Sequence, residues 1–251
     1  MSAVPARPVP ARLDVTAAGR DARTLDLLHG DLEASDLLAL AIGDLFRGRI
    51  ALVSSFGTES AVLLHLAASL DRHLPVIFLD TGKLFEETHA YRQTLIARLG
   101  LTDVRVIRPD PARLAVADPD GRLWRHDPDR CCAIRKVSPL AAALAPFAAW
   151  ITGRKRFQGG ARAALPAFEA EASGRIKLNP LAGWNFERIE AYFAAHDLPR
   201  HPLEADGFLS VGCLTCTAPV DAGGDRRSGR WAGHGKTECG IHLPALGVEQ
   251  E

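Results

Sequence analysis

The sequence predicts an α/β fold built on a doubly wound, mostly parallel sheet. Short apolar runs typical of buried strands alternate with longer segments of helical spacing over most of the chain. From about Gly207 onward, glycine, proline and charged residues dominate and no long periodic segment remains. This change indicates an irregular C-terminal tail after the α/β domain. In such a sheet, ligands bind at the carboxyl ends of the strands.

Each expected strand and helix follows from its own pattern. Residues 49–56, "RIALVSSF", form a short apolar run with β-branched side chains, which predicts a buried strand. The next segment, residues 58–70, has apolar side chains at helical spacing and predicts a helix. Asn185 stands before an amphipathic run and predicts a helix N-terminus. By the same criteria we expect strands at residues 74–80, 103–109, 148–153 and 175–181, and helices at residues 85–99, 130–145 (interrupted near Pro139) and 184–198.

Length and composition suit one large domain with extensions. The chain has 251 residues, of which 47% are apolar, and this is enough for a sizeable core. We expect a mobile Pro/Ala-rich arm at residues 1–25, an α/β domain at residues 26–206 and a C-terminal segment at residues 207–251. The 30 basic and 30 acidic residues balance, which argues against a nucleic-acid partner bound over a broad face.

The sequence also predicts where the protein works. No stretch is apolar for long enough to cross a bilayer, and the N-terminus lacks the apolar core of a secretory signal. Reduced cysteines in a protein that is not exported are typical of the cytoplasm. We therefore expect a cytoplasmic protein without a membrane partner, and a homo-oligomer remains open.

The five cysteines fall into two close pairs and one single residue. Cys131 and Cys132 are adjacent in "RCCAIRK", Cys213 and Cys216 belong to "GCLTC", and Cys239 stands alone in "TECGIH". Adjacent cysteines do not easily adopt disulfide geometry. Four thiolates are the ligand set of a cubane iron–sulfur cluster and also of a structural zinc ion. Spacing alone predicts a metal site and leaves cluster and zinc open.

Three segments offer anion-binding groups where strands are expected to end. "SSFGTES", residues 54–60, brings hydroxyls and backbone N–H groups to a helix N-terminus. "LDTG", residues 79–82, contains Asp80 and Thr81, which would hold a ribose or cap the following helix. "TGRKRFQGGAR", residues 152–162, carries four basic residues, which would contact phosphate or sulfate. A charge run of this kind is also typical of a solvated face.

Together these segments resemble the assimilatory adenylylsulfate/phosphoadenylylsulfate reductase family. The similarity runs in family order over about three quarters of the chain. The two cysteine pairs mark the branch of that family that carries a 4Fe–4S cluster and generally uses adenosine 5′-phosphosulfate. The matching segments are "SSFGTESAVLL", "LDTGKLF", "CCAIRKVSPL", "ITGRKRFQGGARA", "NPLAGW", "VGCLTCTAPV", "RSGRW" and "ECGIH".

The resemblance implies a nucleotide-binding reductase domain of the adenine nucleotide alpha-hydrolase-like (PP-loop) type. It implies that the Cys239 thiolate attacks the sulfur of adenylylsulfate, and that AMP leaves. Reduced thioredoxin then attacks the thiosulfonate and releases sulfite for cysteine biosynthesis. The implied cluster ligands are Cys131, Cys132, Cys213 and Cys216. The implied substrate-binding residues are Ser55, Gly57, Ser60, Leu79, Asp80, Thr81, Gly82, Lys136, Arg162, Arg227 and Arg230.

Two departures from the family pattern and three other interpretations remain. Gly159 follows Gln158 where the family usually has serine, and "AGHGK" follows "GRW" where it usually has aromatic and acidic residues. One alternative is a reductase of the 3′-phosphorylated nucleotide. Another is a PP-loop enzyme that thiolates tRNA or forms amides, although that class usually carries S-G-G-x-D-S and a basic RNA-binding face. The third is a non-catalytic nucleotide-binding module held together by zinc, in which Cys239 has no role.

Overall fold

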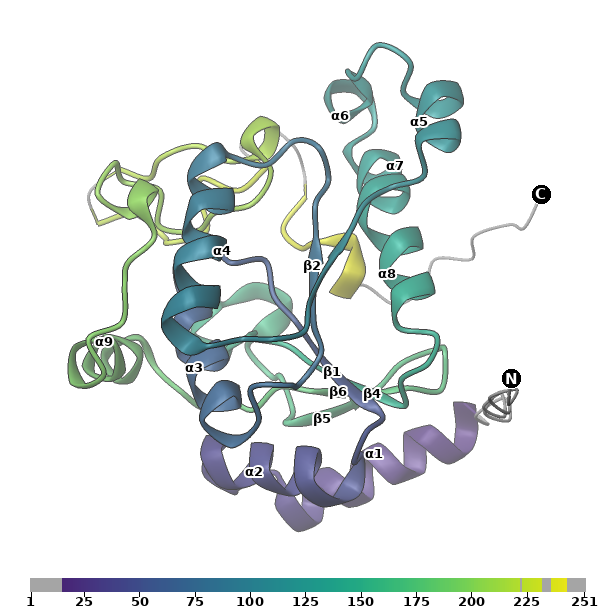
Figure 1. Cartoon of the computed structure of the whole chain (residues 1–251). Coiled ribbons are helices and arrows are strands. Elements are labelled where there is room, and N and C mark those ends of the chain that lie inside the picture. Colours follow the sequence, from purple (N-terminus) through teal and green to yellow (C-terminus); the bar gives the residue numbers. More distant parts are fainter. Residues whose placement is uncertain (1–14, 222, 232–235, 243–251) are drawn as a thin grey trace, which may run out of the picture.

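The structure is a computed structural model that describes residues 15–221, 223–231 and 236–242. At its centre lies a six-stranded sheet in the order β3-β2-β1-β4-β6-β5 (Figure 1). Neighbouring strands run parallel, except that β5 pairs antiparallel with β6 at one edge. This sheet confirms the predicted fold class. Its strands are β1 (Ile50–Val53), β2 (Val76–Leu79), β3 (Val104–Ile107), β4 (Ala149–Ile151), β5 (Phe168–Ala170) and β6 (Ile176–Leu178).

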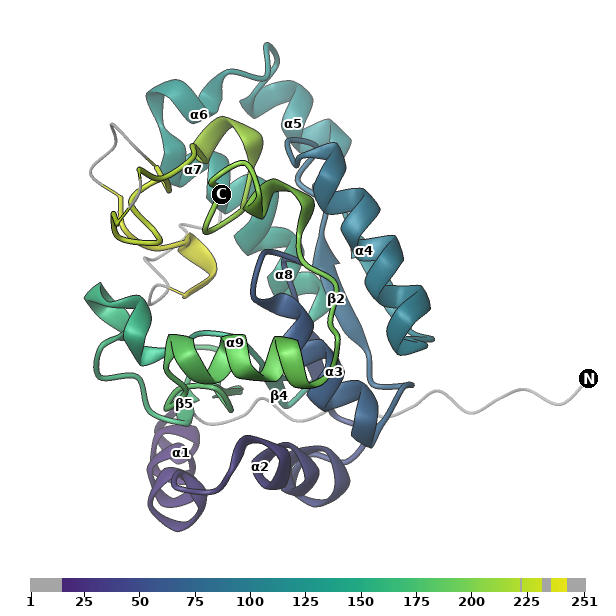
Figure 2. The same ribbon diagram turned by 90° about the vertical axis from the view of Figure 1, so that its left-hand side faces the viewer.

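Helices cover both faces of the sheet. In Figure 1, α3 and α4 lie on one side of β2 and α8 lies on the other, while α1 and α2 lie below the strands. Figure 2 shows α9 on the side of the molecule that also carries α3. The described helices are α1 (Val15–His29), α2 (Ala34–Leu40), α3 (Ser60–Leu70), α4 (Glu86–Leu99), α5 (Pro111–Ala117), α6 (Leu123–His126), α7 (Pro128–Cys132), α8 (Ser138–Ala143) and α9 (Phe186–Ala195).

Alternate side chains of β1 and β4 enter two different cores. Ala51 and Trp150 pack with apolar residues of α8. Their chain neighbours Leu52 and Ile151 point the other way and join the larger core with residues of α3, α4 and α9. Since successive side chains of a strand face opposite sides of the sheet, strands buried on both faces read as continuous apolar runs. That is the pattern from which the sequence predicted these strands.

The strand order creates a crevice between β1 and β4. From β1 the chain adds β2 and β3 on one side, and then returns to add β4 and β6 on the other side. The loops after β1 and β4 therefore diverge at the carboxyl end of the sheet, which is where open α/β sheets bind ligands. These two loops are the predicted anion-binding segments "SSFGTES" and "TGRKRFQGGAR".

The N-terminal part differs from the predicted arm at residues 1–25. Residues 15–29 form helix α1, which packs against the edge strand β5. Asp26 Oδ1 accepts a hydrogen bond from the Phe168 N–H at 3.0 Å, and Ala22 is buried against the core. These tertiary contacts stabilise a segment whose composition alone predicted no structure. Residues 1–14 of the arm lie outside the described residues.

We expected the helical segment at residues 130–145 to be interrupted near Pro139, but it is continuous there. A π-helical turn at Ala133–Val137 joins α7 directly to α8, and Pro139 lies in the first turn of α8. Proline lacks a backbone N–H, so it is tolerated in a first turn that follows a wider π turn. The continuous helix carries Cys131 and Cys132 at the end of α7.

The C-terminal segment is irregular, as predicted. Among its described residues after Gly207, helical structure is limited to the 3₁₀ turns Leu214–Cys216 and Gly240–His242. An isolated β-bridge joins Leu84 to Cys213, so the segment returns to the loop after β2. Most of "AGHGK" lies outside the described residues. None of the described helices is both long and apolar enough to span a membrane.

Candidate active site

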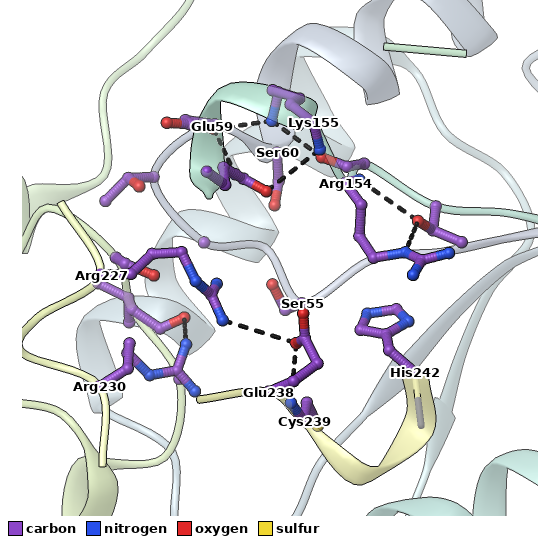
Figure 3. A pocket seen from close by; sticks show the side chains of 18 of the residues that line it. Ser55, Glu59, Ser60, Arg154, Lys155, Arg227, Arg230, Glu238, Cys239 and His242 are labelled. Carbon is purple, nitrogen blue, oxygen red and sulfur yellow. Dashed lines mark hydrogen bonds and ion pairs between the residues drawn. The ribbon is translucent and has the colours of Figure 1, made fainter. Parts of the chain in front are cut away.

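A cavity of about 410 Å³ lies at the carboxyl ends of β1 and β4 (Figure 3). The loops after these two strands, the helical segment around Lys136 and the C-terminal segment form its wall. The structure thus brings together residues that are far apart in the sequence. The predicted residues that line it are Ser55, Gly57, Ser60, Leu79, Lys136, Arg162, Arg227, Arg230 and Cys239.

Phe56 fixes the shape of the loop after β1. Its backbone has a φ of 48°, a left-handed conformation that residues other than glycine rarely adopt. Ser54 Oγ accepts a hydrogen bond from the Phe56 N–H at 3.1 Å, and the ring packs edge-on against Phe78 with centroids 5.4 Å apart. The turn leaves Ser55 exposed near the start of α3. Backbone N–H groups and the helix dipole favour an anion there.

The basic loop after β4 is largely folded into the protein. Lys155 is 2% exposed, and its Nζ donates to Glu59 Oε2 at 2.7 Å and to the Gly153 carbonyl at 2.9 Å. The Gln158 side chain donates to the same carboxylate at 3.0 Å. Burial alone would raise the pKa of Glu59, but Lys155 and Arg226 hold this pKa below its ordinary value. A buried ion pair therefore fastens the loop next to α3, and this part of it is not a solvated face.

The C-terminal segment enters the cavity wall through Glu238. Arg162 Nε donates to Glu238 Oε2 at 2.5 Å, and Arg162 Nη2 donates to Oε1 at 2.7 Å. Arg227 Nη2 lies 3.5 Å from Oε1, and the Cys239 N–H donates to that oxygen at 2.8 Å. Burial would raise the pKa of Glu238, but Arg162 lowers it below its ordinary value. The carboxylate is therefore ionised at neutral pH and ties the tail to the basic loop.

Cys239 lies among groups that favour its thiolate. A hydrogen bond from the Cys132 thiol lowers the pKa of Cys239 well below its ordinary value, against the opposing effect of burial. The positive charges of Lys136 and Arg230 act in the same direction. Burial would lower the pKa of Lys136, but the negative charge of nearby cysteine thiolates, chiefly Cys213 and Cys239, raises it, so this ammonium group stays charged. A thiolate beside fixed cations is suited to act as a nucleophile.

Two arginines of the C-terminal segment place further positive charge at the cavity. The Arg230 guanidinium lies 4.5 Å from the centre of the buried Trp231 ring. It packs so closely on Gly212 that a Cβ there would lie 2.2 Å from Arg230 Nη2. Arg230 Nε has no hydrogen-bond partner among the described residues. Burial and the nearby Arg162 lower the pKa of Arg227 to about 10, which still leaves it charged at neutral pH.

His242 faces the cavity as a neutral imidazole. Its ring stacks on Trp150, with centroids 5.9 Å apart and planes 5° from parallel. Burial lowers the pKa of His242 well below its ordinary value, and the neighbouring cations Arg154 and Lys177 lower it further. Its Nδ1 has no hydrogen-bond partner within the part of the chain that the structure describes. This nitrogen is therefore available to a ligand.

The four paired cysteines are free thiols from two segments that meet beside the cavity. Cys131, Cys132 and Cys213 are buried and Cys216 is half-buried. Burial raises the pKa of Cys131, and the nearby thiols Cys213 and Cys216 raise it further. No group of three or more His, Cys, Asp or Glu side chains among residues 15–221, 223–231 and 236–242 is placed to hold a metal ion. As a donor set, four thiols fit the chemistry of an iron–sulfur cluster.

Three of the four residues of the "LDTG" segment are not part of the cavity wall. Leu79 lines the cavity, but Asp80 is buried, pairs with Arg108 Nε at 3.0 Å and accepts from the Gly82 N–H at 3.1 Å. The hydroxyl of Thr81 lies 3.2 Å from Cys213 Sγ, and Gly82 adopts a φ of 68° in the turn. The polar side chains of Asp80 and Thr81 are thus bound within the protein, and the role of Asp80, Thr81 and Gly82 in binding substrate stays a prediction.

Comparison with known proteins places this site in a family. Residues 49–219 match the model of the phosphoadenosine phosphosulfate reductase domain. The chain belongs to this family. It is 56% identical over 224 residues to a Mesorhizobium japonicum protein named adenosine 5′-phosphosulfate reductase, covering 89% of this chain and 88% of the relative. A Gloeobacter violaceus protein named phosphoadenosine 5′-phosphosulfate reductase is 41% identical over 239 residues, covering 91% of this chain and 98% of the relative.

The fold agrees with this family assignment. The crystal structure of a phosphoadenylyl-sulfate reductase from Candida auris, in a phosphate complex, superposes with a TM-score of 0.67 at 26% identity. The match covers 79% of this chain and 97% of that chain. The comparisons therefore confirm the resemblance that the sequence motifs predicted.

Several residues of the site were missed by the sequence analysis. The carboxylates Glu59, Glu169 and Glu238 each hold a buried cation of the basic loop. Two of them stand inside the quoted motifs, Glu59 in "SSFGTES" and Glu238 next to Cys239 in "ECGIH". Their position in these motifs was the available signal. The sequence did not single out Trp150, because an aromatic residue within an apolar run is typical of any core position.

Replacing Glu59 by glutamine should destabilise the fold, because Lys155 would keep a buried charge without a carboxylate partner. We expect the free energy of unfolding at pH 7 to fall by about 3 kcal/mol, measured by urea denaturation. The pKa of Glu59 lies below its ordinary value of 4.5 in the folded chain. Its contribution is therefore present above about pH 4.5 and is lost as the pH falls through the lower folded value. The difference between variant and wild type should shrink over that range.

The matched control is Glu33→Gln, which removes the exposed ion pair between Glu33 and Arg188. Because both side chains are about half exposed, this change should alter the free energy of unfolding by less than about 1 kcal/mol. Equal effects of the two substitutions at pH 7 would contradict the structural role assigned to Glu59.

Proposed function

We propose that this protein reduces adenosine 5′-phosphosulfate to sulfite and AMP, with Cys239 as the nucleophile and thioredoxin as the electron donor. The reaction would serve assimilatory sulfate reduction and cysteine biosynthesis. The observation that carries the proposal is the position of Cys239, which lines a cationic cavity beside Lys136 and Arg230. The substrate class is supported by relatives named adenosine 5′-phosphosulfate reductase at 56% and 51% identity.

In this proposal the nucleotide lies across the crevice between β1 and β4. Its 5′-phosphate faces Ser55, Gly57 and the N-terminus of α3, where the helix dipole and backbone N–H groups favour an anion. Its sulfate faces Lys136 and Arg230, which are charged and line the same cavity as Cys239. This orientation places the sulfur atom of the substrate next to the thiolate.

The first step is attack of the Cys239 thiolate on the sulfate sulfur. A sulfur–sulfur bond forms, and the bond between that sulfur and the bridging oxygen breaks. The electron pair of the broken bond leaves on the phosphate of AMP, and Cys239 then carries a thiosulfonate. Lys136 and Arg230 offset the repulsion between two anions and the charge that develops on the leaving oxygen.

The second step releases sulfite. A thiolate of reduced thioredoxin attacks Cys239 Sγ, the sulfur–sulfur bond breaks, and sulfite leaves with the electron pair. The second thiol of thioredoxin resolves the mixed disulfide and returns Cys239 as a thiol. Two electrons thus pass from the thioredoxin dithiol, which becomes a disulfide. Because this exchange needs a reducing compartment, we place the reaction in the cytoplasm.

We also propose that Cys131, Cys132, Cys213 and Cys216 hold a 4Fe–4S cluster. The support is the donor set, which consists of four free thiols, three of them buried, from two segments that meet near Lys136. When bound, the cluster would supply a fixed charge beside Lys136. Its binding would also remove the proton that Cys132 donates to Cys239, so Lys136 and Arg230 would remain as the groups that favour the Cys239 thiolate. In the scheme above, the electrons for sulfite formation come from thioredoxin.

The assay that tests the function compares two nucleotides. We expect sulfite release with reduced thioredoxin to show a kcat/KM for adenylylsulfate at least about tenfold above that for its 3′-phosphorylated form, which corresponds to about 1.4 kcal/mol. The second candidate substrate is the 3′-phosphorylated form, since one relative at 41% identity is named for it. A reaction without thioredoxin serves as the control. Equal values, or a preference for the 3′-phosphate, would contradict the proposed substrate.

The cluster proposal predicts a metal content. Protein purified without oxygen should be brown and hold about four irons and four acid-labile sulfides per chain. Cys213→Ser should lose most of both, because one ligand is missing. Cys239→Ser is the matched control and should keep both, since Cys239 is not among the proposed ligands. One zinc per chain without acid-labile sulfide would contradict the cluster and favour a structural zinc ion.

A further inference from the structure

Glu238 and Arg162 form a two-point ion pair inside the cavity wall. Their side chains are 7% and 9% exposed, and two parallel N–H···O hydrogen bonds of 2.5 and 2.7 Å join them. Such a bidentate pair fixes the orientation of both groups as well as their distance. Separating two buried charges without supplying new partners is strongly destabilising, so the pair is a strong attachment for the segment that carries Glu238.

The nitrogen atoms of Arg162 are all engaged by protein groups. Nε and Nη2 donate to Glu238, and Nη1 donates to Gln158 Oε1. A sulfate in the cavity would have to compete with a carboxylate for this guanidinium. Lys136 and Arg230 differ, because both lie near the Cys239 thiolate and Arg230 Nε has no partner among the described residues. The geometry therefore makes Arg162 a partner of the tail more than of the substrate.

The same ion pair is connected directly to the nucleophile. The Cys239 N–H donates to Glu238 Oε1 at 2.8 Å, so the carboxylate that binds Arg162 also fixes the backbone of Cys239. On the other side of Cys239, Gly240 packs so closely that a Cβ there would lie 3.2 Å from Val137 Cγ2. The nucleophile is thus held from both sides, by an ion pair before it and by close packing after it.

We propose that Glu238 is a positioning residue, whose ion pair with Arg162 holds the Cys239 thiolate in the cavity for attack on the sulfate. The inference rests on the proposed function, in which Cys239 is the nucleophile. It also reassigns Arg162, which the sequence analysis counted among the substrate contacts, to the attachment of the tail.

The test compares wild type with Glu238→Gln, Glu238→Asp, Arg162→Gln and the double variant Glu238→Gln/Arg162→Gln. Glu190→Gln is the matched control, since Glu190 forms a more exposed ion pair with Arg200 and neither residue lines the cavity. The first step is followed as AMP formed in a single turnover with adenylylsulfate and no thioredoxin. Binding of AMP is measured separately by calorimetry, so that the loss of positioning can be told from a loss of binding.

We expect Glu238→Gln to slow the first step by about a hundredfold, because a misplacement of about 1 Å costs that much. The dissociation constant of AMP should change by less than about twofold. Glu238→Asp should recover part of the rate, since it keeps the charge. Arg162→Gln should behave like Glu238→Gln, and the double variant should be no slower than either, because one interaction can be lost only once.

A second measurement does not depend on activity. Iodoacetamide labelling of Cys239 at about pH 9, where the thiol is largely ionised, should be slow in the wild type and in Glu190→Gln. It should be faster in Glu238→Gln and Arg162→Gln, as counted on the tail peptide by mass spectrometry. If Glu238→Gln fails to fold, Arg162→Gln and Glu238→Asp make the same comparison.

Three results would overturn the proposal. One is an unchanged first step together with unchanged labelling of Cys239 in Glu238→Gln. Another is a raised KM at unchanged kcat in Arg162→Gln, which would return Arg162 to the substrate. The third is tighter binding of AMP to Glu238→Gln, which would make Glu238 a competitor of the substrate. If the wild type itself formed no AMP, the proposed function would fail, and the labelling alone would still decide whether the ion pair holds Cys239.

Discussion

The constraint on which the site depends is the neutralisation of buried positive charge. A cavity that binds a nucleotide sulfate needs cations, but a buried cation without a partner destabilises the fold by several kcal/mol. The structure meets both requirements by pairing some of its cations internally and leaving others to face the cavity. The internal pairs are Glu59 with Lys155, Glu169 with Arg154 and Glu238 with Arg162.

These pairs also assemble the site from distant parts of the chain. Glu59 precedes α3, Glu169 lies in β5, and Glu238 belongs to the C-terminal segment, yet all three bind the loop that follows β4. The pair between Glu238 and Arg162 also brings the proposed nucleophile to the cavity, because Cys239 follows Glu238 in the chain. The positive charges of Lys136 and Arg230 then remain for the substrate and the thiolate. The internally paired cations thus hold the site together, and the remaining cations face the substrate.

The sequence predicted what is local or chemically rare. Buried strands such as β1 and β4 were found because a parallel sheet covered on both faces requires continuous apolar runs. The cysteine pairs and "SSFGTES" were found because few roles use such residues at such spacing. Helix α1 and edge strand β5 were missed because they are stabilised by packing on each other. The ion pairs were missed because a chain with 30 basic and 30 acidic residues does not reveal which side chains meet.

The most direct test of the account is to find where the sulfate sulfur goes. Wild-type protein is mixed with one equivalent of adenylylsulfate in the absence of thioredoxin, and its peptides are analysed by mass spectrometry. We expect one equivalent of AMP and an added SO3 group on the peptide that carries Cys239. Cys239→Ser should bind the nucleotide but form neither product, since a serine hydroxyl is far less ionised than a thiol. An SO3 group on another cysteine, or AMP release by Cys239→Ser at a comparable rate, would contradict it.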